Sequence, residues 1–261
     1  MLNDDPALLL RSQDTRGVVT LTLNRPQAFN ALSEGLLDAL QRELDAVASE
    51  PCARLLLIKA SGTAFCAGHD LKQMRAEPSR AYYESLFAQC GRMMLSLQAL
   101  PVPVIAQVQG MATAAGCQLV AMCDLAVASA DARFAVSGVN LGLFCATPSV
   151  ALSRNLGRKA AFEMLVTGAF ISAHEALTQG LVNRVVAAGE LDAAVESLVA
   201  SILTKPRVAL ALGKALFYRQ LEVGITPAYA DAASTMACNM MDASALEGVQ
   251  AFIDKRKPNW G

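Results

Sequence analysis

The chain has 261 residues, of which 54% are apolar and 17% are charged. An average globular domain carries about 25% charged residues, so this composition excludes a disordered chain and indicates a large buried core. Lysine plus arginine (22) almost balance aspartate plus glutamate (23), and the net charge of -1 provides no basic field for nucleic acid or an anionic membrane surface.

The first part of the chain alternates between predicted strands and helices. Residues 19–23 alternate apolar side chains with threonines, as a half-buried strand does. Ser33 is placed to cap a helix whose apolar residues recur on one face over residues 37–47. Two continuous apolar runs, residues 55–58 and 104–108, are typical of strands buried on both faces.

The alternation continues beyond the middle of the chain. Ser172 and Glu175 have the spacing of a capping box for a short helix that ends at Gly180. Alternating strands and helices predict an α/β fold with helices packed against sheets. The other elements are predicted over residues 114–122 (helix), 124–128 (strand), 182–186 (strand) and 191–202 (amphipathic helix).

Strand signals stop at Pro206. Residues 206–261 predict three helices, and the middle one, over residues 229–241, is dense in alanine, serine and cysteine. No segment resembles a flexible linker or a sequence repeat. We therefore predict one continuous structural unit, with a core over residues 1–205 and a helical region over residues 206–261.

The centre of the chain is poor in charge. From residue 93 to residue 153 the only charged side chains are two aspartates and one arginine. A spanning helix needs about 20 apolar residues, and the uncharged run over residues 93–123 is long enough. Pro101 and Pro103 interrupt this run, and four glutamines would enter the hydrocarbon, so we expect buried core without a membrane span. A structural membrane protein is the alternative.

The N-terminus and the cysteines bear on compartment. Residues 1–5 are acidic, and the apolar stretch over residues 7–10 is too short for the core of a signal peptide. Seven cysteines without a Cys-x-x-Cys pair, and two histidines, provide neither a disulfide framework nor a zinc site. We expect a cytoplasmic protein with reduced thiols and without a metal.

Two loops rich in small residues each follow a buried strand and precede a helix, over residues 61–72 and 109–118. Small side chains leave backbone N–H groups uncovered, and at a helix N-terminus these donors favour a negatively charged oxygen. Two such loops facing one another would form an oxyanion hole. Close packing is the alternative reading, because small residues after strands also serve that purpose.

The chain carries five segments that match one known family: residues 65–72, 103–124, 139–142, 171–186 and 251–259. Together they resemble the enoyl-CoA hydratase/isomerase (crotonase) superfamily over nearly the whole chain. Within it, the likeness is strongest to the subgroup of enoyl-CoA hydratase domain-containing protein 3, through residues 112–120 and 138–148.

The resemblance implies an α/β fold of the crotonase type, a ClpP-like spiral of ββα units, with C-terminal helices that build a homotrimer or a dimer of trimers. It implies an acyl-CoA thioester as ligand, so that coenzyme A is part of the substrate and not a separate cofactor. The thioester carbonyl would lie between the backbone N–H groups of His69 and Ala115. One such donor contributes about 3 to 4 kcal/mol of transition-state stabilisation.

The resemblance also implies contacts along the coenzyme. Because the two carbonyl donors belong to the main chain, the side chains at those positions can differ without removing the hole. The matching positions are Arg25 and Ala28 near the nucleotide, Ala67, His69, Asp70, Leu71, Lys72 and Ala115 along the pantetheine and adenine path, and Phe252 and Lys255 toward the coenzyme of a neighbouring subunit.

The chain departs from the family at its acid–base positions. Hydratases of the family use two glutamates to handle the water and the proton, and the matching positions here hold Gln118 and Gly138. A glutamine orients water but cannot take its proton, and a glycine provides no side chain. Because each acid–base contribution is worth about 100- to 10,000-fold, we expect slow hydration of a 2-enoyl-CoA.

Few polar side chains are left near the predicted pocket. Among them only His69 has an ordinary pKa suited to proton transfer near neutrality, and simple packing of its ring is the alternative. A nucleophilic Cys145 lacks a base, since His174 belongs to the capping-box helix, and we expect Asp124 to order the following strand. The polar set is His69, Thr113, Gln118, Ser137, Asn140, Cys145 and Thr147.

The expected function is therefore that of an acyl-CoA-binding enoyl-CoA hydratase/isomerase family protein of fatty-acid metabolism, a lyase that depends mainly on its oxyanion hole. Two alternatives stay open. One is a non-catalytic acyl-CoA binder or assembly subunit. The other is an acyl-CoA decarboxylase, because loss of carbon dioxide creates a thioester enolate without a base.

Overall fold

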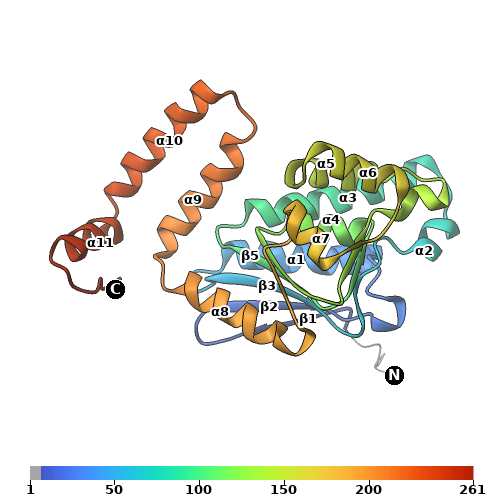
Figure 1. Ribbon diagram of the computed structural model, residues 1–261, viewed down its shortest axis with the longest axis horizontal. Coiled ribbons are helices and arrows are strands. Elements are labelled where there is room, and N and C mark those ends of the chain that lie inside the picture. Colours follow the sequence, from blue (N-terminus) through green and yellow to red (C-terminus); the bar gives the residue numbers. More distant parts are fainter. Residues whose placement is uncertain (1–6, 261) are drawn as a thin grey trace.

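A computed structural model of the chain describes residues 7–260 and contains two β-sheets surrounded by helices (Figure 1). The larger sheet has the order β1-β2-β3-β5-β7-β10, and its pairs are parallel except for β1 with β2. Its strands are β1 (Leu9–Gln13), β2 (Val18–Leu23), β3 (Leu55–Ala60), β5 (Val104–Val108), β7 (Leu125–Ser129) and β10 (Arg184–Val186).

The smaller sheet is built from strands of two or three residues and has the order β4-β6-β8-β9. Its first three strands are parallel, and β9 pairs antiparallel with β8. β4, β6 and β8 each precede a segment of the site described below. The strands are β4 (Ala64–Cys66), β6 (Met111–Thr113), β8 (Arg133–Ala135) and β9 (Ile171–Ser172).

Helices cover both faces of the larger sheet. Helix α1 begins after Ser33, whose side chain accepts a hydrogen bond from Leu36 N (3.3 Å), and buries its apolar face in the main core. Helix α8 packs on the opposite face and closes a second core through Leu191, Val195 and Val199. The helices of the core are α1 (Glu34–Ser49), α2 (Leu71–Ala76), α3 (Arg80–Ala99), α4 (Ala115–Met122), α5 (Ala146–Asn155), α6 (Arg158–Thr167), α7 (Ala173–Gln179) and α8 (Leu191–Leu203), with the 3-10 turns η1 (Pro26–Ala28), η2 (Ser137–Leu141) and η3 (Ala188–Glu190).

The predicted elements of the larger sheet and the capping-box helix are confirmed. Helix α7 begins at the Ser172–Glu175 capping box and ends at Gly180, which adopts the left-handed conformation. The charge-poor centre holds β5, α4 and β7, whose side chains are almost all buried. Within residues 7–260, no helix combines the length and the apolar character that crossing a membrane requires.

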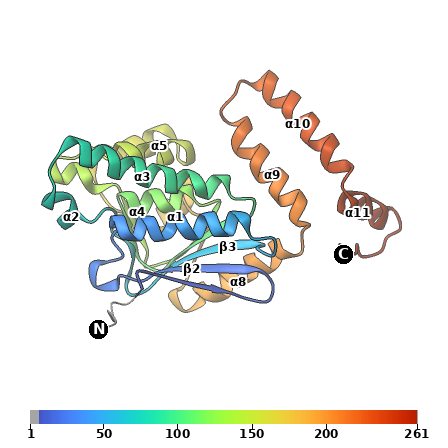
Figure 2. The same cartoon turned by 180° about the vertical axis from the view of Figure 1, so that it is seen from behind.

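The last three helices project from the core, as both views show (Figure 2). They are α9 (Arg207–Gln220), α10 (Ile225–Met240) and α11 (Ala243–Ile253). A buried ion pair holds α9: Lys214 Nζ lies 2.7 Å from Asp124 Oδ2, and Tyr218 donates to Asp124 Oδ1 (2.7 Å). Asp124 also accepts from Val104 N (2.6 Å), so it holds the start of β5, whereas the sequence led us to expect a role in ordering the following strand.

Candidate active site

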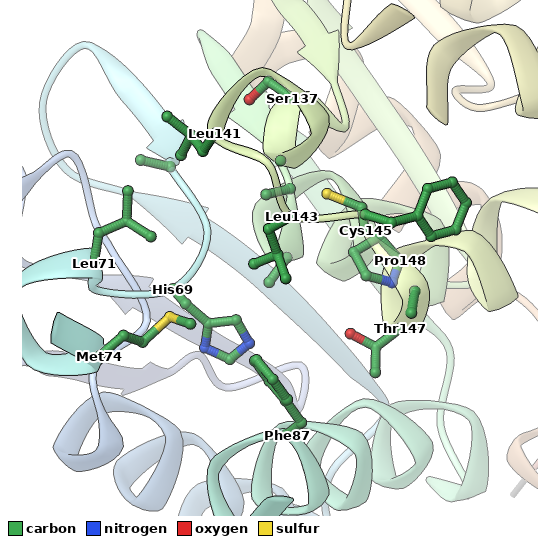
Figure 3. Close-up of a pocket in the computed structure, with 16 residues that line it drawn as sticks. His69, Leu71, Met74, Phe87, Ser137, Leu141, Leu143, Cys145, Thr147 and Pro148 are labelled. Carbon is green, nitrogen blue, oxygen red and sulfur yellow. The ribbon is translucent and has the colours of Figure 1, made fainter. Parts of the chain in front are cut away.

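A cavity of about 220 Å³ lies among α2, α3, the N-terminus of α4 and the segment from η2 to α5 (Figure 3). Most of its lining is apolar. Four of the lining residues carry a polar side chain, namely His69, Ser137, Cys145 and Thr147, and none of the described lining residues carries a carboxylate.

The two small-residue loops of the sequence meet at this cavity. Gly68 adopts a φ of +87°, and a Cβ there would lie 3.1 Å from Ala115 N, so the first loop packs directly on the start of α4. A Cβ on Gly116 would lie 2.1 Å from Cys66 O, a distance that no side chain tolerates. Glycine is therefore required at both points of contact, because the two backbones approach so closely.

Two backbone donors border the same space. Ala115 is the first residue of α4, where the N–H group has no acceptor within the helix. Ala114 before it has a φ of 50°, a left-handed conformation that few residues other than glycine adopt. Both His69 and Ala115 line the cavity, so the structure brings together the two positions that the sequence predicted as donors.

The His69 imidazole is enclosed by Met74, Phe87 and Leu143 (Figure 3). Its ring lies edge-on to Phe87 with centroids 5.4 Å apart, and its buried ring nitrogens have no hydrogen-bond partner. Burial lowers the pKa of His69 to about 4, although the Leu32 backbone offsets part of this effect. The imidazole is therefore neutral at physiological pH.

The two positions that the resemblance matches to glutamates differ in placement. Gly138 lines the cavity, and a Cβ there would lie 2.5 Å from Leu143 O and 2.7 Å from Cys145 Sγ. Gln118 is buried in α4 with Oε1 unpaired, and it is not among the residues that line the cavity. A longer side chain at position 138 is blocked by neighbouring backbone.

The other polar groups of the predicted set contribute little acid–base chemistry. Burial raises the pKa of the Cys145 thiol, so the sulfur is protonated near neutrality. Ser137 shares a hydrogen bond of 3.0 Å with Thr113, which lies outside the lining, as does Asn140. Thr147 lines the cavity from α5.

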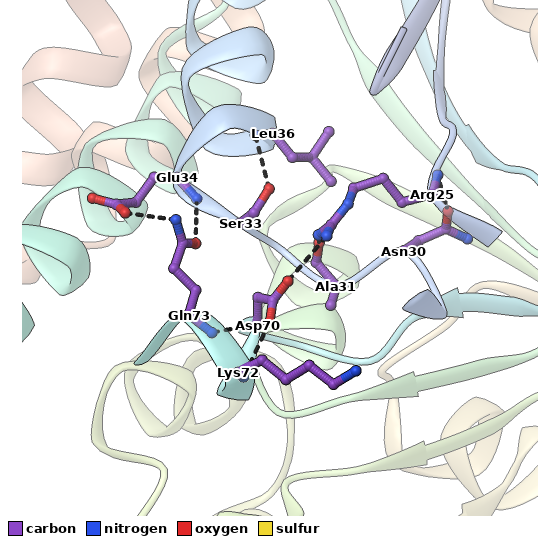
Figure 4. A network of polar contacts seen from close by, with 9 residues as sticks. All are labelled: Arg25, Asn30, Ala31, Ser33, Glu34, Leu36, Asp70, Lys72 and Gln73. Carbon is purple, nitrogen blue, oxygen red and sulfur yellow. Dashed lines mark hydrogen bonds and ion pairs between the residues drawn. The ribbon is translucent and has the colours of Figure 1, made fainter. Parts of the chain in front are cut away.

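The residues predicted along the coenzyme fall into two places. Ala67 and Leu71 line the cavity, while Asp70 caps α2 and forms an ion pair with Arg25 (Figure 4). Lys72 is exposed on α2, and Ala28 ends η1 half-buried.

Helix α11 lies at the far end of the molecule from α2 (Figure 1). Phe252 on this helix is 85% exposed, and Lys255 follows the helix end, also exposed. Within a single chain the structure therefore does not bring these two residues to the cavity. Their predicted contact with a neighbouring subunit stays a prediction.

The sequence reasoning did not single out most of the apolar wall. Met74 comes from α2, Phe87 from α3, and Leu141, Leu143 and Phe144 from the segment before α5. None of these residues stands out by spacing, because any apolar residue on a helix or turn reads as core. Within residues 7–260 no group of three or more His, Cys, Asp or Glu side chains is placed to hold a metal ion.

Comparisons with known proteins show the family of the chain. The enoyl-CoA hydratase/isomerase family profile matches residues 13–261. The chain belongs to the enoyl-CoA hydratase/isomerase family. A relative from Xenopus laevis, "Enoyl-CoA hydratase domain-containing protein 3, mitochondrial", is 46% identical over 248 residues, which span 95% of this chain and 84% of the relative.

Two crystal structures show that this family member shares its fold with solved proteins. The chain is 68% identical to an enoyl-CoA hydratase from Mycobacterium smegmatis, with a TM-score of 0.97 over 97% of this chain and 99% of that chain. It is 42% identical to human enoyl coenzyme A hydratase domain-containing protein 3, with a TM-score of 0.94 over 97% of this chain and 100% of that chain. The crotonase fold and the likeness to this subgroup are confirmed.

The division into a core over residues 1–205 and a helical region over residues 206–261 stays a prediction. The name of the Xenopus relative assigns that protein to mitochondria, so a cytoplasmic location is not confirmed for this member of the family.

Proposed function

We propose that the protein binds an acyl-CoA thioester of fatty-acid metabolism in this cavity, with the carbonyl oxygen between the N–H groups of His69 and Ala115. The convergence of the two loops, with Gly68 packed on the start of α4, carries the proposal. Membership of the enoyl-CoA hydratase/isomerase family supports the ligand class. Coenzyme A enters as part of the substrate, and no separate cofactor takes part.

The chemistry proposed for the site is stabilisation of a thioester enolate by backbone donors. Preorganised N–H groups stabilise the negative charge that develops on the carbonyl oxygen. Gln118 and Gly138 cannot exchange a proton, and the His69 ring is neutral and covered by apolar side chains. Hydration of a 2-enoyl-CoA is therefore a slow reaction of this site.

Decarboxylation of an acyl-CoA is the second candidate. The absence of a carboxylate among the described lining residues favours it, because a second negative charge there would repel the substrate carboxylate. When the bond to the leaving carbon dioxide breaks, its electron pair moves into the thioester enolate, which the two N–H groups stabilise. No side-chain base is needed for this step.

Calorimetry with matched ligands tests the binding proposal. Butyryl-CoA is compared with S-butyl-CoA, in which a methylene group replaces the thioester carbonyl. Loss of two hydrogen bonds is expected to weaken binding about tenfold or more. Equal affinity for both ligands would show that the carbonyl is not held by donors, and no binding of either would refute an acyl-CoA site.

Turnover assays separate the chemical alternatives. Decarboxylation predicts that a malonyl-type CoA is consumed faster than crotonyl-CoA is hydrated, with release of carbon dioxide. Hydration as the main reaction predicts the reverse order. Tight binding of both thioesters without turnover of either would identify a non-catalytic acyl-CoA binder.

The projecting helices support assembly with other copies of the chain. Large apolar side chains are exposed on them, including Phe217, Ile225, Tyr229 and Phe252, the first at 56% and the last at 85%. Contiguous exposed apolar surface marks an interaction site. We expect a homotrimer or a dimer of trimers, and light scattering coupled to gel filtration distinguishes these from a monomer.

A further inference from the structure

The N–H group of His69 owes its direction to a bridge between two loop segments. Leu32 N donates to Gly68 O (2.7 Å), and Asp70 N donates to Leu32 O (3.2 Å). In extended backbone, successive residues present their N–H and C=O groups to opposite sides. Because residues 68 and 70 bond to Leu32, the N–H group of His69 between them faces away from Leu32.

The Arg25 side chain forms hydrogen bonds on both sides of this bridge (Figure 4). Its Nη1 donates to Ala31 O (2.6 Å), one residue before Leu32, and its Nη2 donates to Asp70 Oδ2 (3.0 Å), one residue after His69. The Arg25 and Asp70 side chains are 16% and 17% exposed, so this ion pair is largely shielded from water. One planar guanidinium thus links the two segments that form the bridge.

Each end of the link is itself fixed. Asp70 Oδ1 caps α2 by accepting from Lys72 N (3.1 Å) and Gln73 N (3.3 Å). Burial opposes ionisation of Asp70, yet the hydrogen bonds from Arg25 and from these two N–H groups hold the pKa of its carboxyl below the usual range.

At the other end, the Arg25 backbone is held by Asn30, whose Oδ1 accepts from Arg25 N (2.9 Å). Asn30 Nδ2 donates to Ser61 O and to Ala64 O, both at 2.8 Å, and so reaches the strand that leads into the loop. Asn30 is fully buried and has a φ of 55°. The backbone from which the Arg25 side chain extends is therefore held in place.

We propose that Arg25 is a positioning residue that, through Asp70 and Ala31, fixes the direction of the His69 N–H group toward the ligand carbonyl. The proposal rests on the proposed function, because it assigns that carbonyl as the acceptor. With its guanidinium shared between Asp70 and Ala31, Arg25 acts through the protein rather than on the coenzyme. A displacement of about 1 Å at a reacting centre costs about 100-fold in rate, so a small drift of residues 68–70 is sufficient to weaken the site.

The test measures polarisation of the bound carbonyl, which does not depend on turnover. Crotonyl-CoA labelled with carbon-13 at the thioester carbonyl is bound to the full-length protein, and the carbonyl stretching frequency is recorded by difference infrared spectroscopy. In the wild-type protein two donors lower the frequency relative to free ligand. Arg25→Met is expected to lose at least half of this shift, because the direction of the His69 N–H group is no longer fixed.

Two further variants separate positioning from general damage. Asp70→Asn keeps a side chain that caps α2 but weakens the ion pair, so it should lose part of the shift. Arg11→Met removes a surface arginine that pairs with Glu43 and Glu50, and it should keep the full shift. For any acyl-CoA that the protein turns over, kcat should fall about 10- to 100-fold in Arg25→Met.

The outcomes distinguish this proposal from the one on which it rests. A wild-type protein that binds without any carbonyl shift would overturn both. A normal wild-type shift that persists in folded Arg25→Met and Asp70→Asn would overturn only the positioning role. A loss of affinity of 100-fold with an unchanged shift in Arg25→Met would show instead that Arg25 binds the coenzyme directly.

Discussion

The enclosed His69 ring makes the stability of the protein depend on pH in a defined direction. In the unfolded chain the imidazole takes up a proton near pH 6.5, whereas burial lowers its pKa to about 4 in the folded protein. Between these values the unfolded state binds more protons, so stability falls as the pH falls. The full shift corresponds to about 3 kcal/mol, of which about 2 kcal/mol is lost between about pH 7.5 and about pH 5.

Urea unfolding at these two pH values measures the effect. His69→Phe keeps an aromatic ring beside Phe87 but cannot titrate, so the variant should lose about 2 kcal/mol less than the wild type on acidification. It should also be more stable near neutrality, because the substitution removes buried nitrogens that have no partner. The matched control is His174→Gln at the exposed second histidine, which should lose as much as the wild type. An acid loss in His69→Phe equal to that of the wild type would refute a buried, neutral imidazole.

Two other predictions concern the anchor of α9 and the glutamate positions. Lys214→Met leaves the buried Asp124 carboxylate without its cation and should lower the free energy of unfolding by about 3–5 kcal/mol. In the double variant, Asp124→Asn should restore part of this loss. Additive losses of the two variants in urea unfolding would contradict a direct pair. Gly138→Ala should destabilise the protein by about 1–3 kcal/mol, because the added Cβ meets Leu143 O. The control Gly91→Ala, in open space on α3, should stabilise the protein. Equal effects of the two variants in thermal melts would show that position 138 has room for a side chain.

Restoring the family glutamates should help more at position 118 than at position 138. Gln118→Glu keeps the size of the side chain, but residue 118 does not line the cavity, so hydration of crotonyl-CoA should rise by less than the about 100-fold of a well-placed general base. Gly138→Glu should fail because its Cβ meets Leu143 O before the carboxylate can enter the cavity. Equal gains in a spectrophotometric hydration assay from both variants would show that the segment from η2 to α5 can move aside.

Five strands of the larger sheet were predictable because they carry strong local signals, whereas β1 was not predicted. β3 and β5 are continuous apolar runs, and α1 has both a cap and an apolar face. The individual strands of the smaller sheet were not located from the sequence, since strands of two or three residues are too short for any alternation to be read. Helices α5 and α6 escaped notice for a related reason, as their apolar faces are narrow and interrupted.

For the site, the sequence located the two loops but not the individual residues of the walls. Small residues between a strand and a helix are visible in the sequence, and the family resemblance assigned the two donor positions. The enclosure of His69 by Met74 and Leu143 depends on how α2 and the segment before α5 fold over the loop, which no spacing encodes. The ion pair between Arg25 and Asp70 joins residues 45 positions apart and is equally invisible to local patterns.

The close approach of Gly116 to Cys66 O determines which substitutions should impair the site. The donors of the carbonyl site are backbone N–H groups, so the side chains of the residues that provide them have little effect on the site. A saturation library scored for ligand binding should tolerate many residues at position 69 and few at positions 68 and 116, where added atoms would push the two loops apart. The geometry of this site therefore depends mainly on residues that do not contact the ligand.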